Sequence, residues 1–212
     1  MVGSNNRPSD LSKNGQLGFE KEEALAPFKE KATKEETKTY LIEIKHPQFG
    51  QAVIARELDK FIQARITEFK KLEPPRPDDP RHYKNSLYIT YDQPYITERY
   101  ISLVFYVETY DGGAHPNLVV LTKNYDHRTG KPLKLADLTT INKGKLRSLL
   151  AAKLLATMEQ PDQAMITAGI RAYNLENFTL DPEAITFHFS PDEVACHAAG
   201  AQKASFLLYN LK

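Results

Sequence analysis

The stretch Tyr110-Asp111-Gly112-Gly113-Ala114-His115-Pro116-Asn117 connects two segments that have the composition of β-strands. Apolar residues alternate along residues 101–108 before it, and β-branched and aromatic residues continue along residues 118–125 after it. This pattern is typical of two strands joined as a β-hairpin. The two glycines allow positive φ or a close backbone approach, and the proline fixes φ while it keeps the histidine extended. The sequence therefore predicts a hairpin whose loop has a defined shape.

Length and composition limit what this hairpin can belong to. The chain has 212 residues, of which 41% are hydrophobic, enough for one compact domain or two tightly joined small ones. Its 28 Lys and Arg residues nearly balance its 27 Asp and Glu residues, so no overall charge attracts nucleic acid or anionic lipid. The single cysteine, Cys196, excludes an internal disulfide and a Cys-rich zinc site. We expect it to be a small buried apolar residue.

The N-terminal part of the chain is polar. No segment approaches the about 20 apolar residues that span a bilayer, and the first residues lack the basic and then apolar pattern of a signal peptide. The protein is then either cytoplasmic or without its targeting segment in this sequence, and we favour the second. Residues 1–38 hold too little apolar surface to offset the entropy of ordering, which predicts a flexible tether. The Glu and Lys spacing of residues 29–36 also permits a solvated helix.

The remaining chain predicts an α+β fold with a mostly antiparallel sheet and two main amphipathic helices. A strand over residues 40–45 should end at His46-Pro47, and a helix should follow over residues 53–69. We predict a meander of strands, then a pair of helices, and finally a hairpin with one more strand: 87–91, 100–110, 117–125, 145–159, 162–171, 178–180, 185–189 and 204–209.

Several of these segments resemble a known pair of families. The opening Tyr40–Ile44 with Pro47, the helix after it and the strand ending in Gly112–Asn117 resemble the deacetylase PdaC/RsiV-like domain, DUF4163. Residues 124–138, the run Phe187–Ala195 and Ala198-Ala199-Gly200 are similar to the RsiV-like C-terminal domain, DUF3298. The resemblance implies two small, tightly joined subdomains over residues 39–122 and 123–212.

The resemblance also implies a place outside the cytoplasm. Characterised members include the extracytoplasmic half of an anti-sigma factor that senses lysozyme, and the non-catalytic domain that precedes a peptidoglycan deacetylase. Where the family usually has Pro-Tyr-Glu-Ile-Ala-Pro-Tyr, this chain has Pro-Asp-Glu-Val-Ala-Cys-His at residues 191–197. Tyrosine is a frequent anchor of protein interfaces, so the loss of both tyrosines argues against lysozyme binding of the anti-sigma type.

Histidines and carboxylates near the hairpin raise the question of an enzyme. Asp111 and His115 lie at one end of a predicted strand, while Asp126 and His127 lie at the other, roughly 30 Å away at the rise of a strand. The two groups cannot share a metal, and Asp111 with His115 alone supplies too few ligands. We therefore expect His115 to shape its loop by bonding to the backbone. His188 should face solvent or a cross-strand partner.

Together with the family resemblance, these observations predict a non-catalytic, extracytoplasmic binding or sensor domain without metal or cofactor. Its expected ligand is peptidoglycan or a lysozyme-like protein of the cell envelope. We expect a monomer, held at the membrane only by an N-terminal anchor such as that of a lipoprotein. The candidate contact residues lie in two loops: Asp111, Gly112, Gly113, His115, Asn117, Pro191, Asp192 and His197.

Two alternatives stay open. The first is a metal-dependent hydrolase that acts on envelope polymer with Asp111 and His115. The second is a purely structural domain on a tether. The tyrosines crowded on the central strands could form a carbohydrate or peptide platform, but we expect them to pack between strands: Tyr88, Tyr91, Tyr95, Tyr100, Tyr106 and Tyr110.

Overall fold

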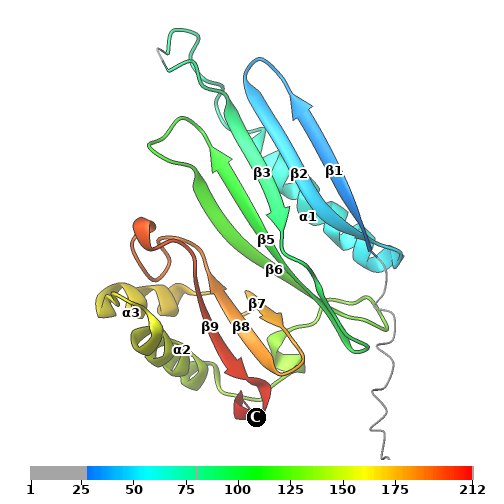
Figure 1. The fold of residues 1–212 in the computed structure, drawn as a ribbon, viewed down its shortest axis with the longest axis vertical. Coiled ribbons are helices and arrows are strands. Elements are labelled where there is room, and N and C mark those ends of the chain that lie inside the picture. Colours follow the sequence, from blue (N-terminus) through cyan, green and yellow to red (C-terminus); the bar gives the residue numbers. More distant parts are fainter. Residues whose placement is uncertain (1–27, 80, 212) are drawn as a thin grey trace, which may run out of the picture.

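The computed structural model describes residues 28–79 and 81–211, and its nine strands and three helices confirm an α+β fold (Figure 1). A six-stranded sheet contains β1 (Phe28–Glu36), β2 (Tyr40–Phe49), β3 (Asn85–Tyr91), β4 (Tyr95–Ile96), β5 (Tyr100–Tyr110) and β6 (Asn117–Asp126). A three-stranded sheet contains β7 (Phe178–Leu180), β8 (Ala184–Phe189) and β9 (Gln202–Leu207). The helices are α1 (Ala52–Phe69), α2 (Lys143–Thr157) and α3 (Gln163–Ala172), and short 3-10 turns lie at Leu135–Asp137, His197–Ala199 and Leu208–Leu211.

The large sheet is not a simple meander. Its order is β1-β2-β3-β5, with β6 on the other edge of β5 and the short β4 beside the first part of β5. The pair β2 and β3 is parallel, while the other pairs are antiparallel. Parallel neighbours need a crossover, and α1 supplies it by running along one face of the sheet (Figure 1). The predicted meander of residues 87–91, 100–110 and 117–125 is confirmed in β3, β5 and β6, and the parallel pairing of β2 with β3 adds to it.

The predicted tether is a strand over part of its length. β1 pairs with β2 from Phe28 opposite Phe49 to Glu36 opposite Leu41, which also excludes the alternative helix there. Its side chains are mostly exposed, and Lys34 pairs with Glu43 at 2.7 Å. Charged residues are common on edge strands because they discourage pairing with other chains. The polar composition of β1 therefore gives no strand signal in the sequence. The predicted residues 1–27 of the tether lie outside the described part of the chain.

β2 also runs further than predicted, because Pro47 does not end it. Pairing with β3 stops at Ile44, and beyond that residue β2 pairs only with β1, where Pro47 lies opposite Glu30. A proline is tolerated in a strand where its missing N–H faces no partner.

Two hydrophobic cores divide the molecule. In the first, Ile54, Leu58 and Ile62 of α1 are buried against the large sheet, and in the second α2 and α3 pack on the small sheet. β6 runs from Asn117 to Asp126 and so continues past the predicted boundary at residues 122 and 123.

Buried polar side chains join the two sheets. Ser102 of β5 donates to Asn124 Oδ1 of β6 at 2.6 Å, and Asn124 Nδ2 donates to the carbonyl of Phe178 at 2.7 Å. The N–H of Leu180 donates to Ser102 Oγ at 2.8 Å. On the edge of β7 that pairs with no strand, the backbone groups of Phe178 and Leu180 thus find hydrogen-bond partners in Asn124 and Ser102. Buried backbone groups need such partners.

Side chains also bond the backbone groups on the outer edge of β6. Asn177 donates to the carbonyl of Val120 at 3.0 Å, and the N–H of Val120 donates to Ser190 Oγ at 3.1 Å. The two sheets are therefore fixed to each other by specific hydrogen bonds.

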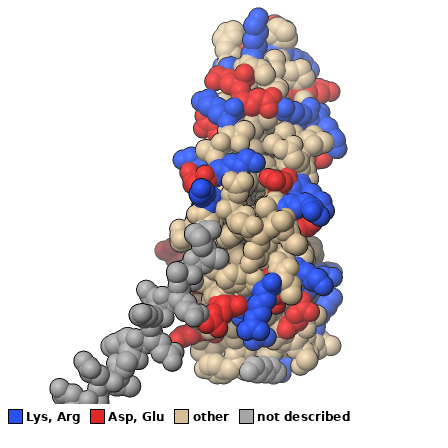
Figure 2. Space-filling view, turned by 90° about the vertical axis from the view of Figure 1, so that its right-hand side faces the viewer, with Lys and Arg blue, Asp and Glu red and all other residues tan. Residues whose placement is uncertain are grey.

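The surface carries both signs of charge. Figure 2 shows Lys and Arg interspersed with Asp and Glu along one face, in keeping with the formal net charge of +1. Among the described helices, none is long and apolar enough to cross a membrane.

Candidate functional site

The hairpin predicted from Tyr110–Asn117 is present. β5 and β6 pair over ten positions, from Tyr100 opposite Asp126 to Thr109 opposite Asn117. Residues 111–116 therefore form the exposed tip of a long ribbon, at one end of the large sheet (Figure 1).

Contacts from the segment before β3 hold this tip in shape. Gly112 has a φ of +91°, and a Cβ placed there would lie 2.2 Å from the ring of Tyr83. The Tyr83 hydroxyl donates to the carbonyl of Asp111 at 3.1 Å, and the Arg81 guanidinium donates to the carbonyl of Gly112. Only glycine satisfies both the backbone angle and the close ring. The predicted defined shape is thereby confirmed.

The second candidate loop, Pro191–His197, connects β8 to the 3-10 turn before β9. Asp192 has a φ of +67°, and its carboxylate accepts from His197 Nδ1 at 2.9 Å. The loop packs closely on α3, since a Cβ at Gly169 would lie 1.8 Å from the carbonyl oxygen of Glu193. Val194 is buried beneath the loop. This loop, too, is held by specific contacts.

The two candidate loops meet through their histidines. The imidazole of His115 stacks on that of His197, with 3.6 Å between ring centroids and 23° between ring planes. His115 Nδ1 lies 3.0 Å from the carbonyl oxygen of Pro116, which confirms its predicted bond to the backbone. We call residues 111–117 together with residues 191–197 the two-loop surface. It contains all eight candidate residues, and its central contact joins positions that show no relation in the sequence.

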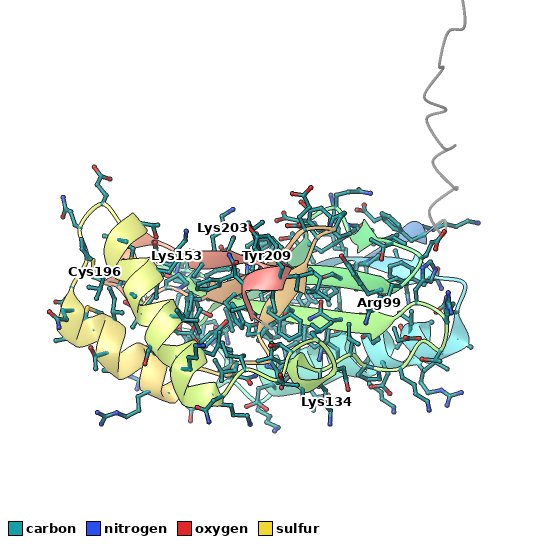
Figure 3. The ribbon with its side chains drawn as sticks, turned by 90° about the horizontal axis from the view of Figure 1, so that it is seen from below. Arg99, Lys134, Lys153, Cys196, Lys203 and Tyr209 are labelled. Carbon is teal, nitrogen blue, oxygen red and sulfur yellow. The ribbon has the colours of Figure 1, made fainter. Side chains whose placement is uncertain are left out.

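A cavity of about 480 Å³ lies beside this surface. It is lined by the connection between α2 and α3 and by the residues that follow Val194. Cys196 lies on this lining and is exposed, so the prediction of a buried cysteine is wrong (Figure 3). The residue before it, Ala195, is buried, and the loop turns outward from there.

A second cavity, of about 500 Å³, lies between the segment joining β3 to β4 and the open face of the small sheet. In it, His188 Nε2 lies 2.7 Å from Thr179 Oγ1 on the neighbouring strand, which confirms the predicted cross-strand partner. Burial, followed by the charge of Lys203, lowers the pKa of His188 to about 4.

Tyr95 also lines this second cavity and is 52% exposed, so it does not follow the prediction that the tyrosines pack between strands. Tyr91 and Tyr100 do follow it. Tyr91 lies opposite Phe105 on the neighbouring strand, with 6.4 Å between ring centroids, and Tyr100 is buried. Tyr106 instead donates to Asp92 at 2.8 Å, and burial raises the pKa of Tyr106 to about 12.

The remaining acidic and histidine residues of the hairpin serve turns. The Thr129 hydroxyl donates to Asp126 Oδ1 at 2.8 Å, and the backbone N–H of Thr129 donates to the same oxygen at 2.7 Å. These two bonds, the hydroxyl bond first, lower the pKa of Asp126. His127 Nδ1 contacts the carbonyl of Thr97. Within residues 28–79 and 81–211, no group of three or more His, Cys, Asp and Glu side chains is placed to hold a metal ion. A hydrolase built on Asp111 and His115 stays a prediction. The described residues place no third metal ligand beside these two side chains.

Comparisons with known proteins agree with this arrangement. Residues 33–118 match the family described as "Deacetylase PdaC", and residues 136–206 match the "Protein of unknown function (DUF3298)" family. No curated protein matches the chain significantly.

Two crystal structures share the fold. A DUF3298 family member from Bacteroides fragilis NCTC 9343 has a TM-score of 0.63 at 17% identity, and the match covers 88% of this chain and 92% of that one. A DUF3298 family protein from Pseudomonas aeruginosa PAO1 has a TM-score of 0.60 at 17% identity, with 89% and 93% covered. Both likenesses extend over the two sheets together. The chain thus contains a region that matches the PdaC family and, after it, a region that matches the DUF3298 family, as its motifs predict.

Proposed function

We propose that this protein is a non-catalytic binding domain that recognises a ligand of the cell envelope through the two-loop surface. The observation that carries the proposal is the stacking of His115 on His197, because it unites the two loops into one exposed surface. The PdaC and DUF3298 matches support the envelope as its setting through the resemblance described above.

The chemistry of the surface favours a polar ligand. Asp111, Asn117 and Asp192 are exposed and offer carboxylate and amide groups around the two imidazoles. No tyrosine stands among residues 191–197, so the large aromatic anchors of many protein interfaces are missing from that loop. Peptidoglycan, with its hydroxyl, amide and peptide groups, suits such a surface better than a lysozyme-like protein does.

The fixed shape of both loops lowers the entropic cost of binding. Gly112 is held under Tyr83, and Asp192 is bonded to His197, so little ordering has to accompany contact with a ligand. We further propose that the domain works as a monomer outside the cytoplasm, on an N-terminal anchor.

A binding assay with variants tests the proposal. The purified protein is incubated with insoluble peptidoglycan and, separately, with immobilised lysozyme, and the bound fraction is measured. We expect retention on peptidoglycan, and a loss of at least several-fold in Asp111→Ala, Asn117→Ala and Asp192→Ala. Glu98→Ala is the matched control, because Glu98 is exposed at the opposite end of β5, about 30 Å from the tip.

Three outcomes separate the possibilities. Retention on lysozyme alone would transfer the proposal to a protein ligand. Equal retention of the loop variants and the control would move the site away from the two-loop surface. No retention on either material would remove both proposed ligands.

A further inference from the structure

The two stacked histidines have chemistry beyond holding the loops together. His115 Nδ1 faces the carbonyl oxygen of Pro116 at 3.0 Å, and His197 Nδ1 faces the carboxylate of Asp192 at 2.9 Å. A carbonyl or carboxylate oxygen only accepts a hydrogen bond, so each Nδ1 carries the proton. Each neutral ring then has its lone pair on Nε2.

This is the arrangement of a metal-binding imidazole. Histidines that ligate metals usually donate their other ring N–H to a backbone carbonyl or a carboxylate, which fixes the tautomer and the ring orientation. Neither Nε2 atom has a hydrogen-bond partner within the described residues. We infer that His115 and His197 bind one divalent transition-metal ion of the Ni²⁺, Cu²⁺ or Zn²⁺ class through their Nε2 atoms.

The two rings lie close enough for one ion to reach both of them once they open apart. The ring centroids lie only 3.6 Å apart, and bonds from zinc to imidazole nitrogen are about 2.0–2.1 Å long. In the stack the ring planes make an angle of 23°, so the two Nε2 lone pairs lie in nearly parallel planes. Sharing one ion therefore requires the rings to open apart by a partial rotation, for which the exposure of His115 and of the His197 side chain, 37% exposed, leaves room.

The charge around the pair also favours a cation. Asp111, Asp192 and Glu193 belong to the same two loops. Arg81 bonds the carbonyl of Gly112 there, but its charge is paired with Asp79 at 2.7 Å. Imidazole selects borderline metals over Mg²⁺ and Ca²⁺, which prefer oxygen. Because the described residues add no third ligand, water or an incoming donor completes the coordination.

A bound ion would clamp the hairpin tip to the loop before β9. Binding to the folded state alone raises stability with ion concentration, so the effect has a readout that does not depend on any envelope ligand. Failure of the peptidoglycan assay above therefore leaves this inference standing, and failure here leaves that proposal standing.

The test is calorimetric titration of the full chain, with any affinity tag removed, with Ni²⁺, Zn²⁺ and Mg²⁺. We expect one Ni²⁺ or Zn²⁺ ion per chain, no Mg²⁺, and affinity at least tenfold weaker in His115→Asn and in His197→Asn. Asparagine keeps a short polar group near the Nδ1 position but has no Nε2, so it separates ligation from loop shaping.

Two matched controls complete the experiment. His82→Asn removes another exposed histidine, whose positive φ of 49° asparagine tolerates, and Cys196→Ser removes the exposed thiol. Both should bind the ion as the unaltered chain does. Circular dichroism verifies that each variant folds. The inference is overturned if the unaltered chain takes up neither ion, or if either histidine variant binds as tightly as His82→Asn.

Discussion

The side-chain amide of Asn124 in β6 donates to the backbone carbonyl of Phe178 in β7 at 2.7 Å, within a region where Asn124 is only 6% exposed. The same side chain accepts from Ser102, which in turn accepts from the N–H of Leu180. One buried amide thus links the PdaC-family region to the DUF3298-family region. The loss of such a link leaves backbone groups of β7 without a partner.

We predict that Asn124→Ala destabilises the protein by about 2–3 kcal/mol, because it leaves a buried carbonyl and a buried hydroxyl unsatisfied. Urea unfolding followed by circular dichroism measures this. Asn210→Ala, at an exposed position, is the control and should change the free energy of unfolding by less than about 0.5 kcal/mol. Equal effects of the two substitutions would show that the buried link contributes nothing.

The adjacent glycines of the hairpin tip should respond differently to alanine. Gly112→Ala combines a positive φ with a clash against Tyr83, so we expect a loss of about 1–3 kcal/mol. Gly113 lies outside the left-handed region, and its nearest neighbour to a new Cβ is 3.7 Å away, so Gly113→Ala should change stability by less than about 0.5 kcal/mol.

A double mutant then separates the two causes at Gly112. Adding Tyr83→Ala to Gly112→Ala removes the clash but not the backbone strain, so the two substitutions should couple. Additive effects, or a cost at Gly113 equal to that at Gly112, would contradict the described shape of the tip.

The pKa of His188, lowered to about 4, predicts a pH dependence of stability. The ordinary pKa of histidine is about 6.5, so the unfolded chain binds a proton between these values and the folded chain does not. The stability that His188 contributes is complete above about pH 6.5 and is lost as the pH falls toward 4. Its full size is about 3 kcal/mol, because the pKa falls from 6.5 to about 4 and one pKa unit corresponds to about 1.4 kcal/mol.

Urea unfolding at pH 7 and at pH 4.5 measures this loss, with His188→Gln for comparison. Glutamine keeps a polar group near Thr179 but does not titrate, so the difference between variant and unaltered chain should shrink toward pH 4.5. A difference that is the same at both pH values would contradict the buried, neutral state of His188.

The start of α2 provides a further check on the DUF3298-family region. Asn142 is its N-cap and accepts from the N–H groups of Gly144 at 2.8 Å and Lys145 at 3.3 Å. Asn142→Ala should cost about 1 kcal/mol, whereas Asn142→Asp should cost little, since a carboxylate accepts the same bonds. Thermal unfolding measures both, and equal losses would argue against the cap.

Much of the fold is predictable because it follows from periodicity. The apolar alternation before Tyr110 predicts β5 to the residue, and the spacing of Ile54, Leu58 and Ile62 predicts α1 within a residue. β1 is not predictable in this way, because its side chains are polar and exposed, and its pairing with β2 depends on backbone bonds. The parallel pairing of β2 with β3 is not predictable from periodicity either, because it depends on which edge of β2 the chain returns to after α1.

The contact at the centre of the candidate site is also not predictable from the sequence. The composition of each loop predicts His115 and His197 separately as contact residues, but no pattern in the sequence relates the two. Their contact depends on how the small sheet docks on β6, which the buried amides Asn124 and Asn177 determine. Spacing along one strand offers only distant metal partners for His115, and it does not indicate the histidine of the other loop.

The central claim is that the two loops form one ligand-binding surface. The most direct test is amide hydrogen exchange of the full chain, with and without saturating soluble peptidoglycan fragments. We predict slower exchange in residues 111–117 and in residues 191–197 together, with no change at the distant turn around Glu98. Protection confined to one loop, or located only at the cavity beside Tyr95, would contradict the claim.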